Sequence, residues 1–135
     1  MIIIKDIPSI ALRKAVFALL KDGQETPVYG GVPTGAKLPY ITLGSGSFKP
    51  LAVKDSCMWQ TSLAVEVWGT LNGKRDVNET LNNIAVLLSY YGNSMKIPDY
   101  QVIETEIDMV EDFPELTTGY HGTLTARFLL QRIED

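Results

Sequence analysis

The sequence predicts a two-layer α+β domain with a mainly antiparallel four-stranded sheet and two helices on one of its faces. Two segments carry apolar residues at helical spacing, and four others alternate apolar and polar residues as strands do. The order along the chain is helix, strand, strand, helix, strand, strand, and consecutive strands are most simply joined as antiparallel hairpins. The polar side of these strands predicts that the second face of the sheet carries no helix.

Length and composition favour one globular domain spanning residues 1–135. Of the 135 residues, 45% are hydrophobic and 21% are charged, which is enough apolar material for a core. The net charge is −4, and no basic cluster is larger than the pair Lys74-Arg75. Because sequence-independent binding to nucleic acid needs a basic stripe that displaces counterions, we expect no DNA-binding surface.

Residues suited to catalysis or metal binding are few. The chain has one cysteine, Cys57, and one histidine, His121, so neither an intramolecular disulfide nor a Cys/His metal set is expected. Cys57 and His121 are candidates for a nucleophile and its base, but no third group is evident to orient them. The simpler interpretation is a small strand-edge residue and a turn residue. We therefore expect no enzyme, no cofactor and no metal.

The sequence gives no sign of a membrane segment. The apolar start Met1–Ile4 is too short for a signal segment, and no apolar run approaches the ~20 residues that span a bilayer. With a single cysteine, we expect a soluble chain made in a reducing cytoplasm.

The first helix is predicted over Ile7–Lys21. Asp6 suits the N-cap, and Pro8 is tolerated in the first turn, where its missing N–H has no helical partner. Asp22-Gly23 is a typical helix end. Beyond one apolar stripe the helix carries further apolar residues, so that it either is deeply buried or packs on a neighbouring chain. These residues are Ile10, Ala15, Phe17 and Ala18.

The next clear strand is Pro39–Gly44, after a turn-rich segment in which Val28-Tyr29 is a candidate short edge strand. Residues Ser45–Trp59 leave two interpretations open. Gly46, Ser47 and Pro50 argue against a regular strand, yet the segment is too apolar for disorder. It is either a long hairpin loop folded on its own side chains or an arm that docks on another chain. The candidate interface residues are Phe48, Leu51, Met58 and Trp59.

The central strand is predicted over Thr61–Gly69. One face carries residues that suit a core, namely Thr61, Leu63, Val65 and Val67. The opposite face carries Glu66 and Trp68, which are unusual on an ordinary solvated surface. Trp68 is therefore a further candidate interface residue.

A second helix over Lys74–Tyr91, with Gly92 as a left-handed C-terminal cap, precedes the last two strands. These strands are predicted over Tyr100–Phe113 and Tyr120–Ile133, joined by a turn at Pro114–Gly119. The inward residues expected on the last strand are Leu124, Ala126, Phe128 and Leu130.

Three carboxylates, Glu104, Glu106 and Asp108, fall on one face of the strand Tyr100–Phe113. They alternate with the apolar residues Ile103, Ile107 and Met109. Such carboxylates suit a metal site or an acid/base pair. The simpler interpretation is a solvated strand face that Arg127 on the adjacent strand partly neutralises.

Short segments in a fixed order resemble the phage tail-completion (tail-to-head joining) family. The segments that carry the resemblance are Tyr29–Pro33, Leu38–Gly44, Leu63–Trp68, Gly73–Leu88 and Gly119–Phe128. Together they run through nearly the whole chain, and their order and spacing are more specific than any one of them. The segment Ser45–Trp59 departs from the family pattern, which leaves any family interface there unassigned.

The resemblance implies a structural, non-enzymatic protein of a long-tailed phage or prophage. Members look like tail terminators, in which a homo-oligomeric ring, typically of six subunits, caps the tail tube and provides the joint to the head-completion or connector protein. The implied partners are the chain itself, the tail tube protein and the connector. DNA is implied to pass without specific binding, and the implied location is the virion tail, assembled in the bacterial host cytoplasm.

In such a ring the face with Glu104, Glu106 and Asp108 is a candidate lining of the lumen, where negative charge would keep DNA from sticking. A second interpretation, from another class of protein, is a small α+β ligand- or metal-binding domain that uses the same acidic face.

Overall fold

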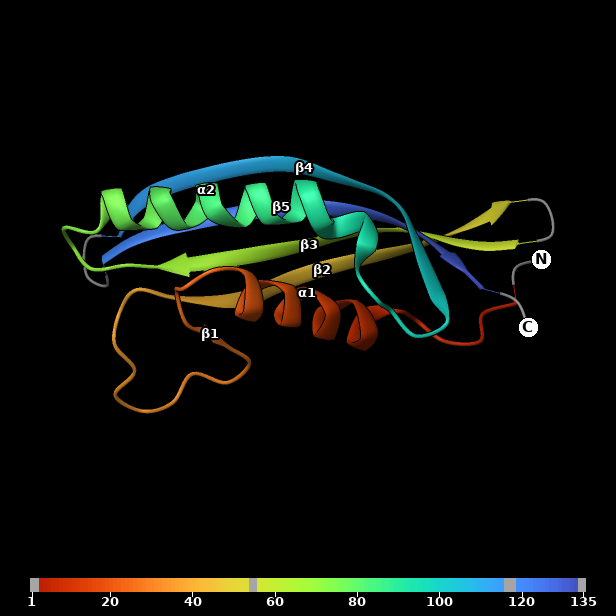
Figure 1. Ribbon diagram of the computed structural model, residues 1–135, viewed down its shortest axis with the longest axis horizontal. Coiled ribbons are helices and arrows are strands. Elements are labelled where there is room, and N and C mark those ends of the chain that lie inside the picture. The colour runs from red at the N-terminus through yellow and green to blue at the C-terminus, as the bar shows by residue number, and fades with distance from the viewer. Residues whose placement is uncertain (1–2, 54–55, 116–118, 134–135) are drawn as a thin grey trace.

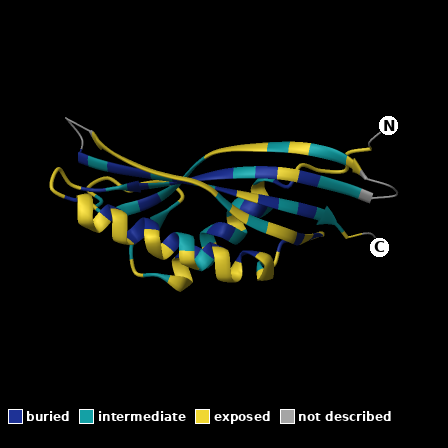
Figure 2. Cartoon of the chain, turned by 90° about the horizontal axis from the view of Figure 1, so that it is seen from above, coloured by how far each residue is buried: buried dark blue, intermediate teal, exposed yellow. Residues whose placement is uncertain are grey.

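The computed structural model describes residues 3–53, 56–115 and 119–133. The elements along the chain are α1 (Ser9–Gly23), β1 (Val28–Tyr29), β2 (Tyr40–Val53), β3 (Ser56–Trp68), α2 (Lys74–Tyr91), the 3-10 turn η1 (Gly92–Ser94), β4 (Tyr100–Glu115) and β5 (Gly119–Arg132). The strands form one sheet in the order β1-β2-β3-β5-β4, and both helices lie on the same face of that sheet (Figure 1, Figure 2).

The sheet has five strands and is mixed, which corrects the expected four-stranded antiparallel sheet. The pairs β2–β3, β3–β5 and β4–β5 are antiparallel, so both expected hairpins are present. The additional strand β1 runs parallel to β2, with Val28 opposite Ile41 and Tyr29 opposite Thr42. At two residues β1 is too short to show a periodic pattern, so the sequence identified it only as a candidate edge strand.

The core lies between the helices and the inner side chains of the strands. Leu12, Val16 and Leu20 of α1 recur at helical spacing and are fully buried, as expected for an amphipathic helix on a sheet. The same holds for α2, through Val77, Leu81, Ile84 and Leu88. Opposite them stand the residues expected to face inward on β3 and β5, among them Leu63, Val65, Val67, Leu124, Ala126, Phe128 and Leu130.

The segment Ser45–Trp59 is neither a loop nor a separate arm but the outer half of a long β2–β3 hairpin. Regular antiparallel pairing runs from Gly46 opposite Leu63 to Val53 opposite Ser56. A bulge between Leu43 and Gly46 takes up the extra residues of β2. Beyond Thr42, β2 has no second neighbour among the described residues, and proline is tolerated on such an edge, so Pro50 did not exclude a strand.

Helix α1 begins two residues later than expected, and Asp6 does not cap it. Pro8 occupies the N-cap position and makes no side-chain cap hydrogen bond. The Asp6 carboxylate instead accepts hydrogen bonds from the Tyr100 hydroxyl and, at 2.6 Å, from Arg132 Nη1. Asp6 therefore fastens the segment before α1 to the start of β4 and the end of β5.

Helix α2 has the predicted bounds, but Gly92 is not a left-handed cap. Its φ and ψ are −55° and −44°, so the chain stays right-handed and continues into η1. Glycine is needed there for space, because a Cβ atom would lie 2.5 Å from Thr105 Oγ1 on β4.

Two bulges break the alternation expected along β4. The register against β5 shifts between Val102 and Glu104 and again between Ile107 and Met109. Ile103 and Met109 are consequently exposed rather than inward, and Ile107 is half-buried against the core. The strand also runs to Glu115, so Pro114 and Gly119 belong to strands, and residues 116–118 of the expected turn lie outside the described residues.

Candidate functional site

The face of the sheet opposite the helices is left uncovered, and most of the candidate site residues lie on it (Figure 2). Pairing in register places Glu66 opposite Thr123 and Trp68 opposite His121 on this face. Because partners in an antiparallel pair share a face, the outward residues of β2, β3, β5 and β4 form one continuous surface.

Glu66 and Trp68 belong to a small cluster centred on His121. The His121 ring, only 8% exposed, stacks on Trp68 with centroids 3.9 Å apart and meets the ring of Phe113 edge-on at 4.8 Å. His121 Nε2 and Glu66 Oε2 are hydrogen-bonded, and Thr123 Oγ1 donates to the same oxygen at 2.7 Å. These contacts explain why Glu66 and Trp68 occur on the outer face.

The other edge of Trp68 is fixed from β2. Its Nε1–H donates to Thr42 Oγ1 at 3.0 Å. With Tyr40 it borders an open, mainly apolar hollow of about 470 Å³, which the loop residues Val32 and Leu38 also line. Trp68 is therefore held on two sides and remains half-buried. A fixed aromatic ring beside an apolar hollow suits a contact residue.

Cys57 and His121 do not form a nucleophile–base pair. Cys57 lies at the far end of the β2–β3 hairpin opposite Ala52, whereas His121 pairs with Trp68 at the other end of β3. Trp68 lies eleven positions after Cys57 along the same strand, which is roughly 36 Å at the usual rise. His121 is a strand residue in a packed cluster and not a turn residue.

The acidic residues of β4 lie along an edge strand of the sheet. Glu104 stands opposite Leu129 and Glu106 opposite Arg127, both on the uncovered face. Arg127 Nη2 forms an ion pair with Asp108 Oδ1 at 3.2 Å, which is the expected partial neutralisation from β5. Glu111, opposite Thr123, extends the stripe and was missed because the second bulge shifts it onto this face.

The next carboxylate of β4, Asp112, faces α2 instead. Asn78 Nδ2 donates to Asp112 Oδ2 at 2.9 Å, and the Tyr120 hydroxyl donates to the same oxygen at 2.8 Å. These hydrogen bonds, from Asn78 first and then Tyr120, lower the pKa of Asp112 below its ordinary value. Asp112 thus ties the edge strand to the helix layer.

The four candidate interface residues of the hairpin lie on opposite faces. Trp59, only 2% exposed, and Phe48 face the helix side and pack with the core. Leu51 and Met58 pair with each other on the uncovered face and are half-buried. The hairpin end that carries them extends past both helices (Figure 1).

Helix α1 is not deeply buried, so the first of the two alternatives stated for it is wrong. Ile10 is 72% exposed, and Lys14, Ala18 and Lys21 are exposed along the same side of the helix. Its outer side is therefore a free surface of this chain, available to another chain.

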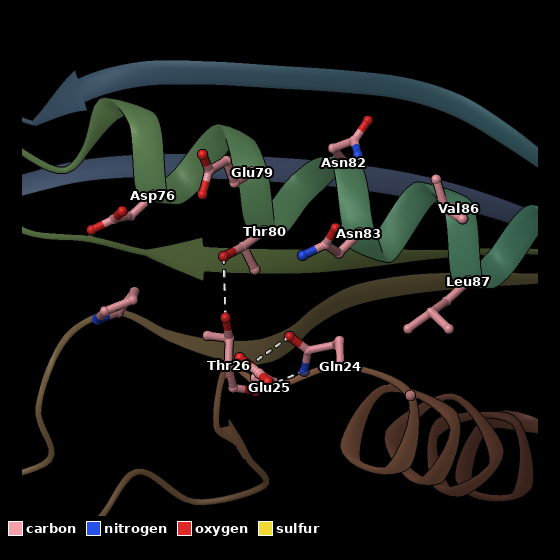
Figure 3. A pocket seen from close by; sticks show the side chains of 12 residues that line it. Gln24, Glu25, Thr26, Asp76, Glu79, Thr80, Asn82, Asn83, Val86 and Leu87 are labelled. Atoms are coloured by element: carbon pink, nitrogen blue, oxygen red, sulfur yellow. Dashed lines mark hydrogen bonds between the residues drawn. The ribbon is translucent and has the colours of Figure 1, made fainter.

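A polar groove separates α2 from the segment that follows α1 (Figure 3). Its volume is about 670 Å³, and Glu25, Asp76 and Glu79 contribute carboxylates to its lining. Thr26 and Thr80 join its two sides through their hydroxyls, 3.2 Å apart. Among the residues that the structure describes, no three His, Cys, Asp or Glu side chains are grouped to hold a metal ion, in this groove or on the β4 stripe.

No helix in the described part of the chain has the length and apolarity needed to cross a membrane.

Comparison with known proteins identifies one family. The family model described as Tail completion protein gp17 matches residues 11–131. A chain from a solved structure of the virion of a native gene transfer agent (GTA) particle is similar in fold, with a TM-score of 0.62 and 16% identity. That similarity covers 93% of this chain and 92% of the other. Among curated proteins, none matches this chain.

Proposed function

The chain belongs to the Tail completion protein gp17 family, and from this premise we propose that it works as a homo-oligomeric ring that completes a phage-like tail. In this proposal six copies cap the finished tail tube, stop its polymerisation and present a surface to the head connector. The observation that carries the proposal is the family match, because it extends over residues 11–131.

The character of the surface supports a role in contact rather than in catalysis. Exposed apolar side chains stand beside charged ones on α1 and on β4. Heterologous contacts between such surfaces close into a ring when the rotation per subunit closes. The two residues that could have formed a nucleophile–base pair, Cys57 and His121, lie at opposite ends of β3.

The proposed location is the virion tail of a phage or prophage, with assembly in the bacterial host cytoplasm. DNA then passes through the ring without specific binding. Six copies at −4 each carry a formal charge of −24, and negative charge along the passage would limit adhesion of DNA.

In such a ring the stripe of Glu104, Glu106 and Asp108 has two possible positions. It lines the lumen, where it would face DNA, or it lies against the neighbouring subunit. The two differ in what removal of the charge does, since loss of a lumen lining impairs DNA passage and leaves the ring intact.

The proposed function is tested by adding the purified protein to growing tail tubes of the phage or prophage that encodes it. We expect it to bind one tube end, visible by electron microscopy, and to stop elongation at substoichiometric amounts relative to tube subunits. Heat-unfolded protein at the same concentration is the control. Tubes that continue to elongate with the folded protein present, and carry no density at their ends, would contradict the proposal.

A further inference from the structure

We propose that neighbouring subunits meet edge to edge, with the exposed side of α1 on one copy packed against the acidic strand β4 of the next copy. The inference rests on the proposed ring and names the surfaces that build it. The partner is a second copy of this chain, and the contact is heterologous because its two halves differ.

The first step is the position of the two surfaces. The strand order places β1 and β4 at the two margins of the sheet. Helix α1 contacts β1 and β2, whereas α2 contacts β3, β4 and β5. Figure 1 shows α1 and β4 on opposite sides of α2. When two subunits join through opposite margins, the pair still has one free surface of each kind, so further copies can add until the ring closes.

The second step is charge. Strand β4 holds Glu104, Glu106, Asp108, Glu111, Asp112 and Glu115 and no basic residue. Helix α1 holds Arg13, Lys14 and Lys21 and the single acid Asp22. Arg13 is engaged by the chain itself, since its Nη1 donates to the Gly44 carbonyl oxygen at 2.8 Å.

Most of the charges that would meet across the boundary have no ionic partner among the described residues of the subunit, and Asp108, paired with Arg127, is the exception. Among the described residues, neither Lys14 and Lys21 nor Glu104, Glu106 and Glu111 takes part in an ion pair. Opposite charges on two margins of one molecule favour head-to-tail contact and disfavour contact between like margins.

The third step is apolar area. Ile10 on α1 is 72% exposed, and Ile7 just before the helix is 59% exposed. On β4, Met109 is 53% and Val110 is 47% exposed. Each margin therefore offers apolar side chains among charged ones, the composition of an interface with an apolar centre and a charged rim.

The backbone of both margins argues for contact through side chains rather than for one sheet that continues between subunits. Strand β4 has two bulges, and the unpaired part of β2 carries Lys49 and Pro50. Bulges, lysine and proline are the devices that prevent an edge strand from pairing with another chain. Packing against a helix uses the acidic side chains without needing the edge hydrogen bonds.

The experiment exchanges the charges. Lys14→Glu with Lys21→Glu, and separately Glu104→Lys with Glu106→Lys, place like charges on both sides of the boundary. We expect each pair to weaken association at least about a hundredfold, measured by native mass spectrometry and by occupancy of tube ends. The variant with all four changes restores opposite charges, and we expect it to assemble again.

Lys74→Glu with Lys96→Glu is the matched control for the α1 pair, since both lysines are exposed, neither belongs to α1 or β4, and the net charge changes by the same amount. The inference would be overturned if either charge-reversed pair assembled as strongly as the parent protein. It would also be overturned if the variant with all four changes kept the parent melting temperature but failed to assemble. A further variant, Glu104→Gln with Glu106→Gln and Asp108→Gln, removes the charge, and its ring assembly and DNA exit are measured. An intact ring with slowed DNA exit would overturn the inference in favour of the lumen.

The outcome for the unmodified protein separates this inference from the proposed function. A parent chain that neither forms rings nor caps tubes overturns both. A parent chain that caps tubes while its charge-reversed variants also cap them overturns the edge contact and leaves the proposed function standing.

Discussion

Gly92 shows how one residue can be required for space rather than for backbone freedom. Its backbone is right-handed, which any residue adopts, but an added Cβ would lie 2.5 to 2.9 Å from three side-chain atoms of Thr105. Thr105 is β-branched and half-buried, so its side chain has little freedom to move away. The turn after α2 can therefore approach β4 only without a side chain at position 92.

We expect Gly92→Ala to destabilise the domain by about 1–3 kcal/mol, the usual cost of overpacking. Gly31→Ala is the control, because nothing lies within 4 Å of a Cβ atom there and its φ is not positive. Urea unfolding of both variants gives the comparison. Equal urea midpoints for the two variants would show that the Thr105 side chain moves aside without a loss of stability.

Glu66 and Trp68 mark the limit of what single residues reveal before the fold is known. Their types identified the outer face of β3 as unusual, and the structure places both in one cluster. Their partner His121 was missed because it lies 53 residues beyond Trp68, and only the β3–β5 register brings the two rings together. A residue pattern shows that a side chain needs a partner, whereas the register decides which partner it has.

The elements with strong periodicity were predictable, and those shaped by local exceptions were not. Helix α2 has its predicted bounds because four buried apolar residues recur at helical spacing along its eighteen residues. The outer half of the β2–β3 hairpin was obscured by Gly46 and Pro50, whose local preference the long pairing with β3 overrides. In β4, the bulge between Ile107 and Met109 moved Met109 and Glu111 to the outer face against the simple alternation.

Three separate segments are joined at Tyr100, and this junction gives the domain a pH dependence in alkali. Tyr100 is 4% exposed, and its hydroxyl donates to Asp6, which also binds Arg132. Burial first, and then the hydrogen bond to Asp6, raise the pKa of Tyr100 from 10.0 to about 12. The phenol is therefore harder to ionise in the folded chain than in the unfolded one.

Below pH 10 both states keep the phenolic proton, and the stabilisation linked to it is fully present. Between pH 10 and about 12 the unfolded chain releases this proton first, so the free energy of unfolding falls as the pH rises. We expect Tyr100→Phe to lessen this decline by about 2–3 kcal/mol. Urea unfolding from pH 9 to 12 measures it, with Tyr90→Phe, at a position 77% exposed, as control. Parallel curves for the parent and Tyr100→Phe would contradict the linkage.

The whole molecule is longer than it is wide, so it has two long sides and two ends that can contact different partners. If the margins formed by α1 and β4 meet neighbouring subunits, the ends of the long axis are left for the tail tube and the head connector. One end is formed by the outer half of the β2–β3 hairpin, whose described strands project beyond both helices (Figure 1). On its uncovered face Leu51 and Met58 lie opposite each other, while Trp59 on the reverse face is buried in the core.

We therefore expect the outer half of the hairpin, through Leu51 and Met58, to contact the tube and not the neighbouring subunit. Leu51→Ala with Met58→Ala should leave the melting temperature and the ring unchanged, and should weaken binding to tube ends by about thirtyfold, as expected for loss of an interface anchor worth about 2 kcal/mol. Trp59→Ala is the comparison on the other face, and it should cost about 3–5 kcal/mol of stability. Titration of tube ends by electron microscopy, with native mass spectrometry of the same samples, separates the two effects. Loss of the ring in the Leu51/Met58 variant would place the outer half of the hairpin between subunits instead, because a contact with the tube alone cannot hold a free ring together.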